Sequence, residues 1–387
     1  MVWMVRESRL DEAQQNLLRR WASMSDKPIW IEGFAGSGKT VLLIHAAQKY
    51  LQKNPESKIC VVVFTHALKD MIETGISPEY QHKVPVMTYL YFVNRNKANY
   101  DLVVIDEVQD VPESILKAIR RRTKKILVAG DDAQSIYESG CRAEQIESVL
   151  EPERMKLPMV YRLTRKIINV VKNILPDTQM VTATSGRMQE IQVTLAHMDS
   201  YDTECFWVWD QAKRLSETSH PSVVVLPSHD EVLRFLRFVA KNEGIEIPTL
   251  DINIRGERLD YTPTNKVFEH NSAGACLQYL GNSHGSLTLA DSRPVVYVMT
   301  YHSIKGLDFR TVFLPLLNSD TFFWKGNTDI DRRLFFVGAT RSRRDLFMSY
   351  SSLEPHQYIK EMPQEELHKM EINKDDVKFS DDDDYFF

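Results

Sequence analysis

A glycine-rich segment at residues 33–40, Gly-Phe-Ala-Gly-Ser-Gly-Lys-Thr, constrains the fold of this 387-residue chain more than any other feature. The apolar run Pro28 to Ile31 precedes it, and helical apolar spacing from Val41 to Leu51 follows it. A strand, a glycine loop and a helix in this order place backbone N–H groups around phosphates at a helix N-terminus, where the helix dipole favours anions. The alternative, an ordinary glycine-rich turn, does not explain the strand and helix on either side.

We therefore expect a site for ATP and Mg²⁺ at this loop. Lys39 is expected to reach the β- and γ-phosphates, and the Thr40 hydroxyl is expected to bind magnesium. The residues expected to bind the nucleotide through the loop are Gly33, Gly36, Gly38, Lys39 and Thr40.

Two adjacent carboxylates support this interpretation. The apolar run Leu102 to Ile105 leads directly into Asp106 and Glu107, which places both acids at the C-terminal end of a buried strand. There Asp106 can hold magnesium, and Glu107 can orient or deprotonate the attacking water. An acidic pair alone could merely cap the next helix, but together with the glycine loop it indicates nucleotide hydrolysis.

The pattern along the chain predicts an α/β protein of two lobes. Unbroken apolar runs of strand length, such as Lys58 to Phe64, suit parallel strands that are buried on both faces. Pro112 is expected to begin a helix that ends in the basic run Arg120 to Lys125. We expect lobes at residues 1–153 and 154–365, with a reduced insertion near 255–292, and an acidic flexible tail at 366–387.

Composition excludes few functions. No apolar run is long enough to span a membrane, and the four scattered cysteines fit buried free thiols in a reducing cytoplasm. Residues 371–387 carry seven acids and two lysines, which account for the whole net charge of −5. A neutral body neither requires nor excludes nucleic-acid binding, because a local basic groove is enough.

Residues 106–110, Asp-Glu-Val-Gln-Asp, resemble the DExQD box of superfamily 1A helicases of the Rep/UvrD/PcrA type. Other boxes follow in that family's order across nearly the whole chain. The resemblance implies two RecA-like P-loop NTPase lobes with parallel sheets flanked by helices. It also implies a cytoplasmic enzyme that hydrolyses ATP and binds single-stranded DNA.

In the first lobe the resemblance assigns four further roles. Gln14 would bind the adenine base, and Gln134 would sense the γ-phosphate. Phe64 and Thr65 resemble the first box that contacts single-stranded DNA, although the family usually has Asn where this chain has His66. Tyr137 would lie towards the bound strand.

In the second lobe the resemblance assigns six more. Tyr161 would pack on adenine, Arg162 would reach the γ-phosphate, and Arg341 would be the second arginine finger. Thr300 and His302 would contact the DNA backbone. Asp308 stands where the family has a Glu near the ribose.

Size sets this chain apart from the family. Asp106 lies only 67 positions after Lys39, which leaves no room for the family's first accessory subdomain. The sequence favours a translocase on single-stranded DNA, with 3′→5′ direction implied by resemblance alone. The alternative is a regulatory or effector ATPase subunit of a nuclease-containing defence or repair complex. An RNA helicase is disfavoured by the details of the boxes.

The tail ends in four aspartates followed by Tyr385, Phe386 and Phe387. An acidic terminus often serves only solubility, which does not explain the three aromatics. It resembles the acidic tip with which bacterial single-strand-binding proteins recruit DNA-processing partners. We expect it to dock on a protein partner, such as a nuclease or DNA-processing factor, or on the chain's own DNA groove.

Overall fold

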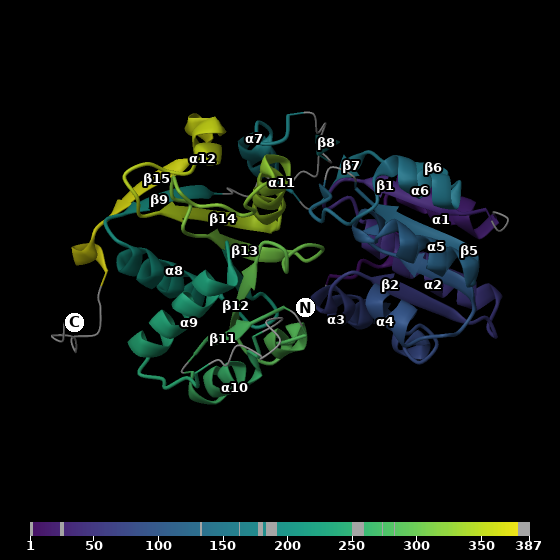
Figure 1. Cartoon of the computed structure of the whole chain (residues 1–387), viewed down its shortest axis with the longest axis horizontal. Helices are drawn as coiled ribbons and strands as arrows, with labels where there is room; N and C mark the ends of the chain where they lie inside the picture. Colours follow the sequence, from purple (N-terminus) through teal and green to yellow (C-terminus); the bar gives the residue numbers. More distant parts are fainter. Residues whose placement is uncertain are drawn as a thin grey trace. The chain divides into compact units, whose positions relative to one another are not determined.

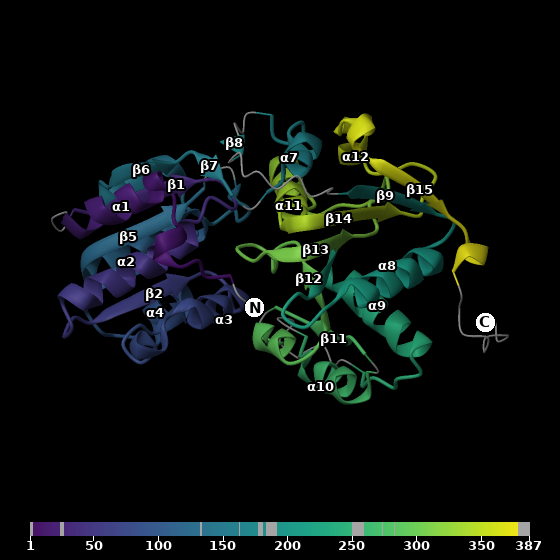
Figure 2. The same cartoon turned by 180° about the vertical axis from the view of Figure 1, so that it is seen from behind.

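The computed structural model describes residues 3–23, 27–131, 134–161, 163–176, 181–182, 192–249, 259–272, 274–281 and 283–377. The chain divides into two compact units, which we call the first lobe (residues 2–163 and 178–186) and the second lobe (residues 164–177 and 187–387). Figures 1 and 2 show both from opposite sides.

The first lobe is built on a six-stranded parallel sheet with the order β3-β2-β4-β5-β1-β6. Its central strands are continuous apolar runs because both faces are covered. The strands are β1 (Ile29–Gly33), β2 (Ile59–Val63), β3 (Val86–Thr88), β4 (Tyr100–Ile105), β5 (Thr123–Gly130) and β6 (Glu153–Leu157). A short parallel pair, β7 (Met159–Val160) and β8 (Val181–Thr182), lies apart from this sheet.

Helices cover both faces of this sheet (Figures 1 and 2). Side chains alternate along each strand, so that Trp30 and Val62 point into a core closed by Phe92, Leu116 and Ile146 of the α4, α5 and α6 helices. The α1, α2 and α3 helices pack together on the other face. The helices are α1 (Glu12–Ser23), α2 (Lys39–Lys53), α3 (His66–Gly75), α4 (Tyr89–Asn94), α5 (Glu113–Arg121) and α6 (Ala143–Leu150), with short 3-10 turns η1 (Glu7–Arg9), η2 (Pro78–Tyr80) and η3 (Val108–Asp110).

An N-terminal strap precedes these elements and packs on α3. The indole N–H of Trp3 donates to the Met71 carbonyl (2.9 Å) and to Thr74 Oγ1 (3.0 Å). The ring covers Gly75 so closely that a Cβ there would lie nearer than 3.0 Å to it. The strap therefore depends on glycine at this position.

Two sequence expectations for the first lobe need correction. The expected lobe boundary at 153–154 falls at the start of β6, which pairs with β1 from Ile29↔Glu153 to Gly33↔Leu157, so the first lobe continues to Leu163. The basic run does not all end a helix, because α5 ends at Arg121 and Lys125 belongs to β5. The ammonium of Lys125 is buried and lies 4.2 Å from the centre of the Trp21 ring.

The second lobe has a seven-stranded parallel sheet with the order β11-β12-β10-β13-β14-β9-β15. The strands are β9 (Val193–Met198), β10 (Ser222–Leu226), β11 (Cys276–Tyr279), β12 (Val295–Thr300), β13 (Phe309–Leu314), β14 (Ser342–Tyr350) and β15 (His368–Ile372). The helices are α7 (Arg165–Val171), α8 (Tyr201–Leu215), α9 (His229–Asn242), α10 (Thr262–Asn271), α11 (Thr328–Ala339) and α12 (Gln357–Glu361), with the 3-10 turns η5 (Leu287–Asp291), η6 (Gln364–Glu366) and η7 (Lys374–Asp376).

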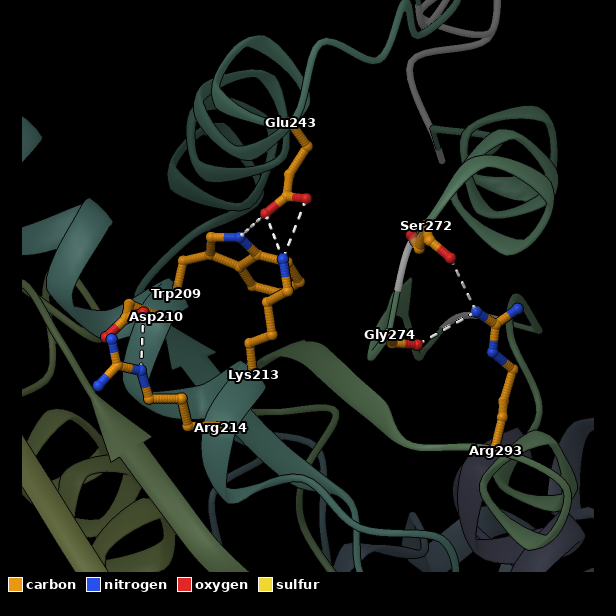
Figure 3. A network of polar contacts seen from close by, with 8 residues as sticks. All are labelled: Trp209, Asp210, Lys213, Arg214, Glu243, Ser272, Gly274 and Arg293. Atoms are coloured by element: carbon orange, nitrogen blue, oxygen red, sulfur yellow. Dashed lines mark hydrogen bonds and ion pairs between the residues drawn. The ribbon is translucent and has the colours of Figure 1, made fainter. Parts of the chain in front are cut away.

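One face of this sheet carries a large core under α8, α9 and α10, while α11 packs on β13 and α7. Polar contacts tie α8 to the end of α9, as Figure 3 shows: Trp209 Nε1 and Lys213 Nζ both donate to Glu243 Oε1, at 2.7 and 2.8 Å. Arg293 donates to the carbonyls of Ser272 and Gly274 just after α10. This network is structural, because each group satisfies a helix end or an ion pair.

Two further expectations fail in the second lobe. The region 255–292, expected to be a reduced insertion, contains α10 and β11 and so belongs to the lobe itself; its residues 255–258 lie outside the described part. The expected tail boundary at 365–366 also moves, because β15 pairs with β9 from His368↔Thr194 to Ile372↔Met198. The tail residues 378–387 lie outside the described residues.

Each lobe is a parallel sheet between layers of helices, which confirms the expected α/β architecture of two lobes with parallel sheets flanked by helices. All four cysteines are free and buried, as expected. Within the described ranges, the structure contains no helix both long and apolar enough to cross a membrane.

Candidate nucleotide and strand sites

The glycine loop joins β1 to the N-terminus of the fifteen-residue helix α2. Gly36 (φ 79°) and Gly38 (φ 88°) adopt the left-handed conformation that favours glycine. A Cβ at Gly38 would lie 2.6 Å from Gln14 Nε2, and one at Gly33 would lie 2.6 Å from Ser37 Oγ. The loop is therefore compact enough to require its glycines, and it presents backbone N–H groups at a helix N-terminus.

Lys39 is buried at the start of α2, and its ammonium lies over the loop. The Nζ atom donates to the carbonyls of Gly33 (2.5 Å) and Phe34 (3.1 Å). These carbonyls stabilise a cation at the position where a phosphate-binding loop needs one.

Gln14 connects α1 to the same loop. Its amide Nε2 donates to the Ser37 carbonyl (3.1 Å), while its Oε1 accepts from the Asp11 N–H (3.2 Å). The Gln14 N–H in turn donates to Asp11 Oδ1 (2.8 Å). The predicted adenine-binding residue is thus held at the edge of the loop by its own helix cap.

Asp106 follows β4 and faces the start of α2. The Thr40 hydroxyl donates to Asp106 Oδ2 (2.6 Å), and the Glu107 N–H donates to Oδ1 (3.0 Å). The pKa of Asp106 is raised to about 6, chiefly by burial and then by the neighbouring Glu107, against the lowering effects of Thr40 and Lys39. A cation bound beside this carboxylate would favour its ionised form.

Glu107 lies next to this pair with an unusual backbone, φ 52° and ψ 50°, in the left-handed region. Its Oε2 accepts from Gln109 Nε2 (2.5 Å). Gln134, in the loop after β5, donates from Nε2 to Asp131 Oδ2. The first lobe therefore brings together all the predicted catalytic residues that it contains, except Arg162, which lies outside the described residues.

Three aromatic rings lie near the carboxyl ends of the neighbouring strands. Phe64 follows β2, and its ring stacks on Tyr89 (5.0 Å between centres) and lies against Tyr137 (4.2 Å). Thr65 caps α3 by accepting from the Leu68 N–H (3.2 Å). Phe64, Thr65 and Tyr137, which are predicted to contact single-stranded DNA, therefore lie at one edge of the first sheet.

Tyr161 lies in the first lobe, which corrects its expected place in the second. Its ring is 43% exposed, and its backbone N–H donates to the Gly36 carbonyl (2.9 Å). The residue is thus bound to the glycine loop through its backbone, because β6 runs beside β1.

Thr300 is the last residue of β12 in the second lobe, and His302 follows it two positions later. The Thr300 side chain is buried, and its Oγ1 accepts from the Ser303 N–H (3.2 Å). His302 lies 5.2 Å from the Trp324 ring, centre to centre. The pKa of His302 is lowered to about 4, chiefly by burial and then by electrostatic interaction with Lys305 and His229. Contact of either residue with nucleic acid stays a prediction.

Asp308 and Arg341 belong to the other end of this lobe. Asp308 forms an ion pair with Arg343. Arg341 is buried, and its guanidinium donates to the carbonyls of Val337 (Nε, 2.8 Å) and Leu307 (3.4 Å) and to Thr340 Oγ1 (3.0 Å). Its predicted role as an arginine finger is not tested by these contacts.

Sequence reasoning missed three residues. Tyr89 directly follows β3 just as Phe64 follows β2, and neighbouring parallel strands end at one edge, so its place could have been inferred. Gln109 lies inside the DExQD box, but only the structure shows that its side chain is hydrogen-bonded to both Glu107 and Asp131. Trp324, 39% exposed, is brought to His302 by a loop without a sequence signal.

Two family models match the chain. One, described as an AAA domain, matches residues 19–140, which include the glycine loop and the acidic pair. The other, described as a UvrD-like helicase C-terminal domain, matches residues 277–353 and so includes Thr300 and Arg341.

Curated relatives match shorter stretches. The ATP-dependent DNA helicase Rep of Buchnera aphidicola subsp. Schizaphis graminum is 34% identical over 87 residues, covering 19% of this chain and 13% of the relative. DNA helicase II of Rickettsia typhi is 32% identical over 88 residues, covering 18% of this chain and 13% of the relative. The matches thus span about an eighth of each relative's length.

Solved structures match over more of the chain but at low identity. The arterivirus nonstructural protein 10 helicase in complex with DNA has 14% sequence identity and a TM-score of 0.41, covering 89% of this chain and 64% of that protein.

Proposed function

We propose that this chain is a superfamily 1 helicase of the UvrD/Rep type, which its matches to an AAA domain model, a UvrD-like helicase C-terminal domain model and a Rep helicase support, and that it hydrolyses ATP and moves along single-stranded DNA in the 3′→5′ direction. The observation that carries the proposal is the glycine loop at the N-terminus of α2, with the Thr40–Asp106 hydrogen bond and Glu107 beside it. A phosphate cradle, a pair of oxygen ligands and an adjacent base are together what phosphoryl transfer to water requires.

The chain's own residues divide the work. Loop N–H groups and Lys39 bind the phosphates, and Gln14 orients the adenine base of ATP at the edge of the loop. Glu107 orients the attacking water and accepts its proton. Gln134 and the arginines Arg162 and Arg341 act on the developing charge, as the resemblance implies.

Thr40 and Asp106 fit a magnesium ion, because a hydroxyl and a carboxylate oxygen 2.6 Å apart are the hard donors that Mg²⁺ uses beside substrate phosphates. Among the residues that the structure describes, no group of three or more His, Cys, Asp or Glu side chains offers a separate metal site. When bound, magnesium neutralises charge on the transferring phosphate.

The aromatic edge suits single-stranded DNA. Bases stack on exposed or partly exposed rings with about 1–3 kcal/mol each, and Phe64, Tyr89 and Tyr137 form a continuous set of rings. This edge is also where β4 delivers Asp106, so strand binding and nucleotide binding meet at the same end of one sheet.

Two substitutions test the ATPase proposal. Lys39→Ala is expected to weaken nucleotide binding and abolish turnover, because the cation on the phosphates is lost. Glu107→Gln is expected to bind ATP but not cleave it. Lys117→Ala, an exposed change on α5 of the same lobe, is the control. Wild-type turnover in Glu107→Gln would remove the proposed role of Glu107.

Movement on DNA is tested with the purified full chain. Single-stranded DNA should accelerate ATP hydrolysis, and the acceleration should fall steeply as salt is raised, because phosphate contacts release counterions. Streptavidin displacement from 3′- and 5′-biotinylated strands reads the direction. Displacement from the 3′ end alone would contradict the proposed direction.

A second candidate function is a regulatory ATPase subunit of a nuclease-containing defence or repair complex. The described elements α2, β2, α3, β3 and α4 fill the stretch between the glycine loop and β4, so the first lobe has no separate subdomain there to engage duplex DNA. This favours weak unwinding of duplex DNA by the chain in the absence of a partner protein. ATP turnover that does not respond to DNA, but does respond to a co-purified protein, would support this candidate.

The acidic aromatic tail is the proposed docking segment for such a partner. Truncation before Asp381 should abolish capture of the partner, or raise DNA affinity at low salt if the tail instead covers the DNA groove. If neither quantity changes, the tail serves only solubility.

A further inference from the structure

We propose that Gln109 is a positioning residue that holds the Glu107 carboxylate and links it to the loop carrying Tyr137. The inference rests on the proposed function, because it concerns how the water-activating carboxylate is held. Gln109 itself touches neither the phosphate loop nor the aromatic edge through any contact described above, so its role is to act through Glu107.

The side chain of Gln109 is fully buried and hydrogen-bonded at both ends. Its Nε2 donates to Glu107 Oε2 (2.5 Å), and its Oε1 accepts from the Asp131 N–H (3.2 Å). An amide is the side-chain group that offers a donor and an acceptor side by side at this length. A carboxylate would lose the donor, and an apolar side chain would lose both bonds.

The last glycine of β5 and a glycine of the loop between β5 and α6 both lie close against Gln109. A Cβ at Gly130 would lie closer than 3.0 Å to Gln109 Oε1, and a Cβ at Gly140 would lie closer than 3.0 Å to the Gln109 carbonyl oxygen. Contacts this close leave no room for a side chain at either position. The end of β5 and the end of the loop that follows it therefore both pack closely on Gln109.

That loop also contains the groups proposed to sense phosphate and DNA. Gln134 donates to Asp131 Oδ2, and the Asp131 N–H donates to Gln109. Tyr137 lies in the same loop with its ring against Phe64. A shift of Tyr137 when a base stacks on the ring set therefore reaches Glu107 through the Asp131–Gln109–Glu107 hydrogen bonds.

Glu107 needs such support because its backbone does not hold it in a common conformation. A non-glycine residue at φ 52° and ψ 50° is strained by roughly 1 kcal/mol or more. The conformation persists only where neighbours over-determine it, and Gln109 supplies a bond to the side chain that must point at water. The strained residue caps the 3-10 turn η3, and the residue that restrains it lies two positions later in that turn.

The test compares Gln109→Met, which keeps the volume and loses both bonds, with Gln109→Glu, which keeps the shape and loses the donor. Both should lower kcat for ATP by about 10-fold to 100-fold, with KM for ATP nearly unchanged, and both should reduce the acceleration by single-stranded DNA. The matched control is Gln145→Glu on α6, where the glutamine also bridges two groups, Glu113 (2.8 Å) and the Arg142 N–H (2.8 Å). Its kcat and DNA response should be those of the wild type.

A double-mutant cycle separates positioning from general packing. If Gln109 acts through Glu107, then Gln109→Met in a Glu107→Gln background should change the residual single-turnover rate less than about threefold. The same fold loss in both backgrounds would show a merely structural role and overturn the inference, as would an unchanged kcat in both single variants. An inactive wild type would instead contradict the proposed function.

Discussion

Acid should destabilise the second lobe through His302, because the half-buried ring resists protonation. The pKa of His302 is lowered from 6.5 to about 4, first by burial and then by Lys305 and His229. In the unfolded chain the same imidazole binds a proton near its ordinary pKa. Stability from this group is therefore complete above about pH 6.5 and is lost as the pH falls towards about 4.

The magnitude follows from the shift. A change of 2.5 in pKa corresponds to about 3 kcal/mol when fully expressed. Lowering the pH from about 7.5 to about 5 protonates His302 in the unfolded state and leaves the folded ring neutral, which costs about 2 kcal/mol. The ring is partly exposed, so solvent screening reduces the expected loss to about 1–2 kcal/mol.

The assay is urea unfolding of the wild type, His302→Gln and the exposed control His368→Gln at about pH 7.5 and about pH 5. Because the chain has two lobes, each variant is compared with the wild type under identical conditions. His302→Gln should lose about 1–2 kcal/mol less than the wild type between the two pH values, and His368→Gln should follow the wild type. An identical acid loss in His302→Gln and the wild type would refute the reasoning.

Three other substitutions have expected outcomes. Asp331→Ala should destabilise the second lobe by about 3 kcal/mol or more. The buried carboxylate accepts hydrogen bonds from two backbone N–H groups of the preceding loop (2.7 Å each) and from the Tyr358 hydroxyl (2.8 Å). A loss of stability below about 1 kcal/mol in urea unfolding would contradict this prediction. Gly75→Ala should displace Trp3 and cost roughly 1–3 kcal/mol, measured by unfolding, with unchanged indole fluorescence as the contrary result. Arg341→Ala should lower kcat for ATP by about 100-fold or more with little change in nucleotide affinity, and a loss confined to affinity would remove Arg341 from the catalytic set.

The elements nearest the nucleotide loop were predictable from sequence. Continuous apolar runs mark strands buried on both faces, and the run Lys58 to Phe64 became β2, Ile59–Val63. The glycine loop and Asp106 were found because their chemistry depends on fixed local spacing. The meeting of Thr40 with Asp106 at 2.6 Å then follows from the parallel sheet.

The elements that were missed lack such local signals. The β6 strand (Glu153–Leu157) alternates between exposed and buried residues, as an edge strand does, so nothing in its sequence reveals β1 as its partner. In the supposed insertion, Asn265 and Gln278 have the composition of a loop. Both are buried because their amides bond to backbone groups, including Asn265 Nδ2 to the Tyr279 carbonyl (2.9 Å). Polar residues paired in this way are invisible to a reading of hydropathy.

The hydrogen bond from the Tyr161 N–H to the Gly36 carbonyl directly couples the phosphate loop to the segment through which the chain leaves the first lobe. The chain leaves this lobe after Leu163, two residues beyond that bond. A nucleotide that rotates the Gly36 peptide removes the hydrogen-bond acceptor of the Tyr161 N–H. The segment around Tyr161 then responds directly to nucleotide binding at the loop, with no intervening side chains. A reporter dye at the exposed Tyr161 side chain would read the nucleotide state at the root of the connection to the second lobe.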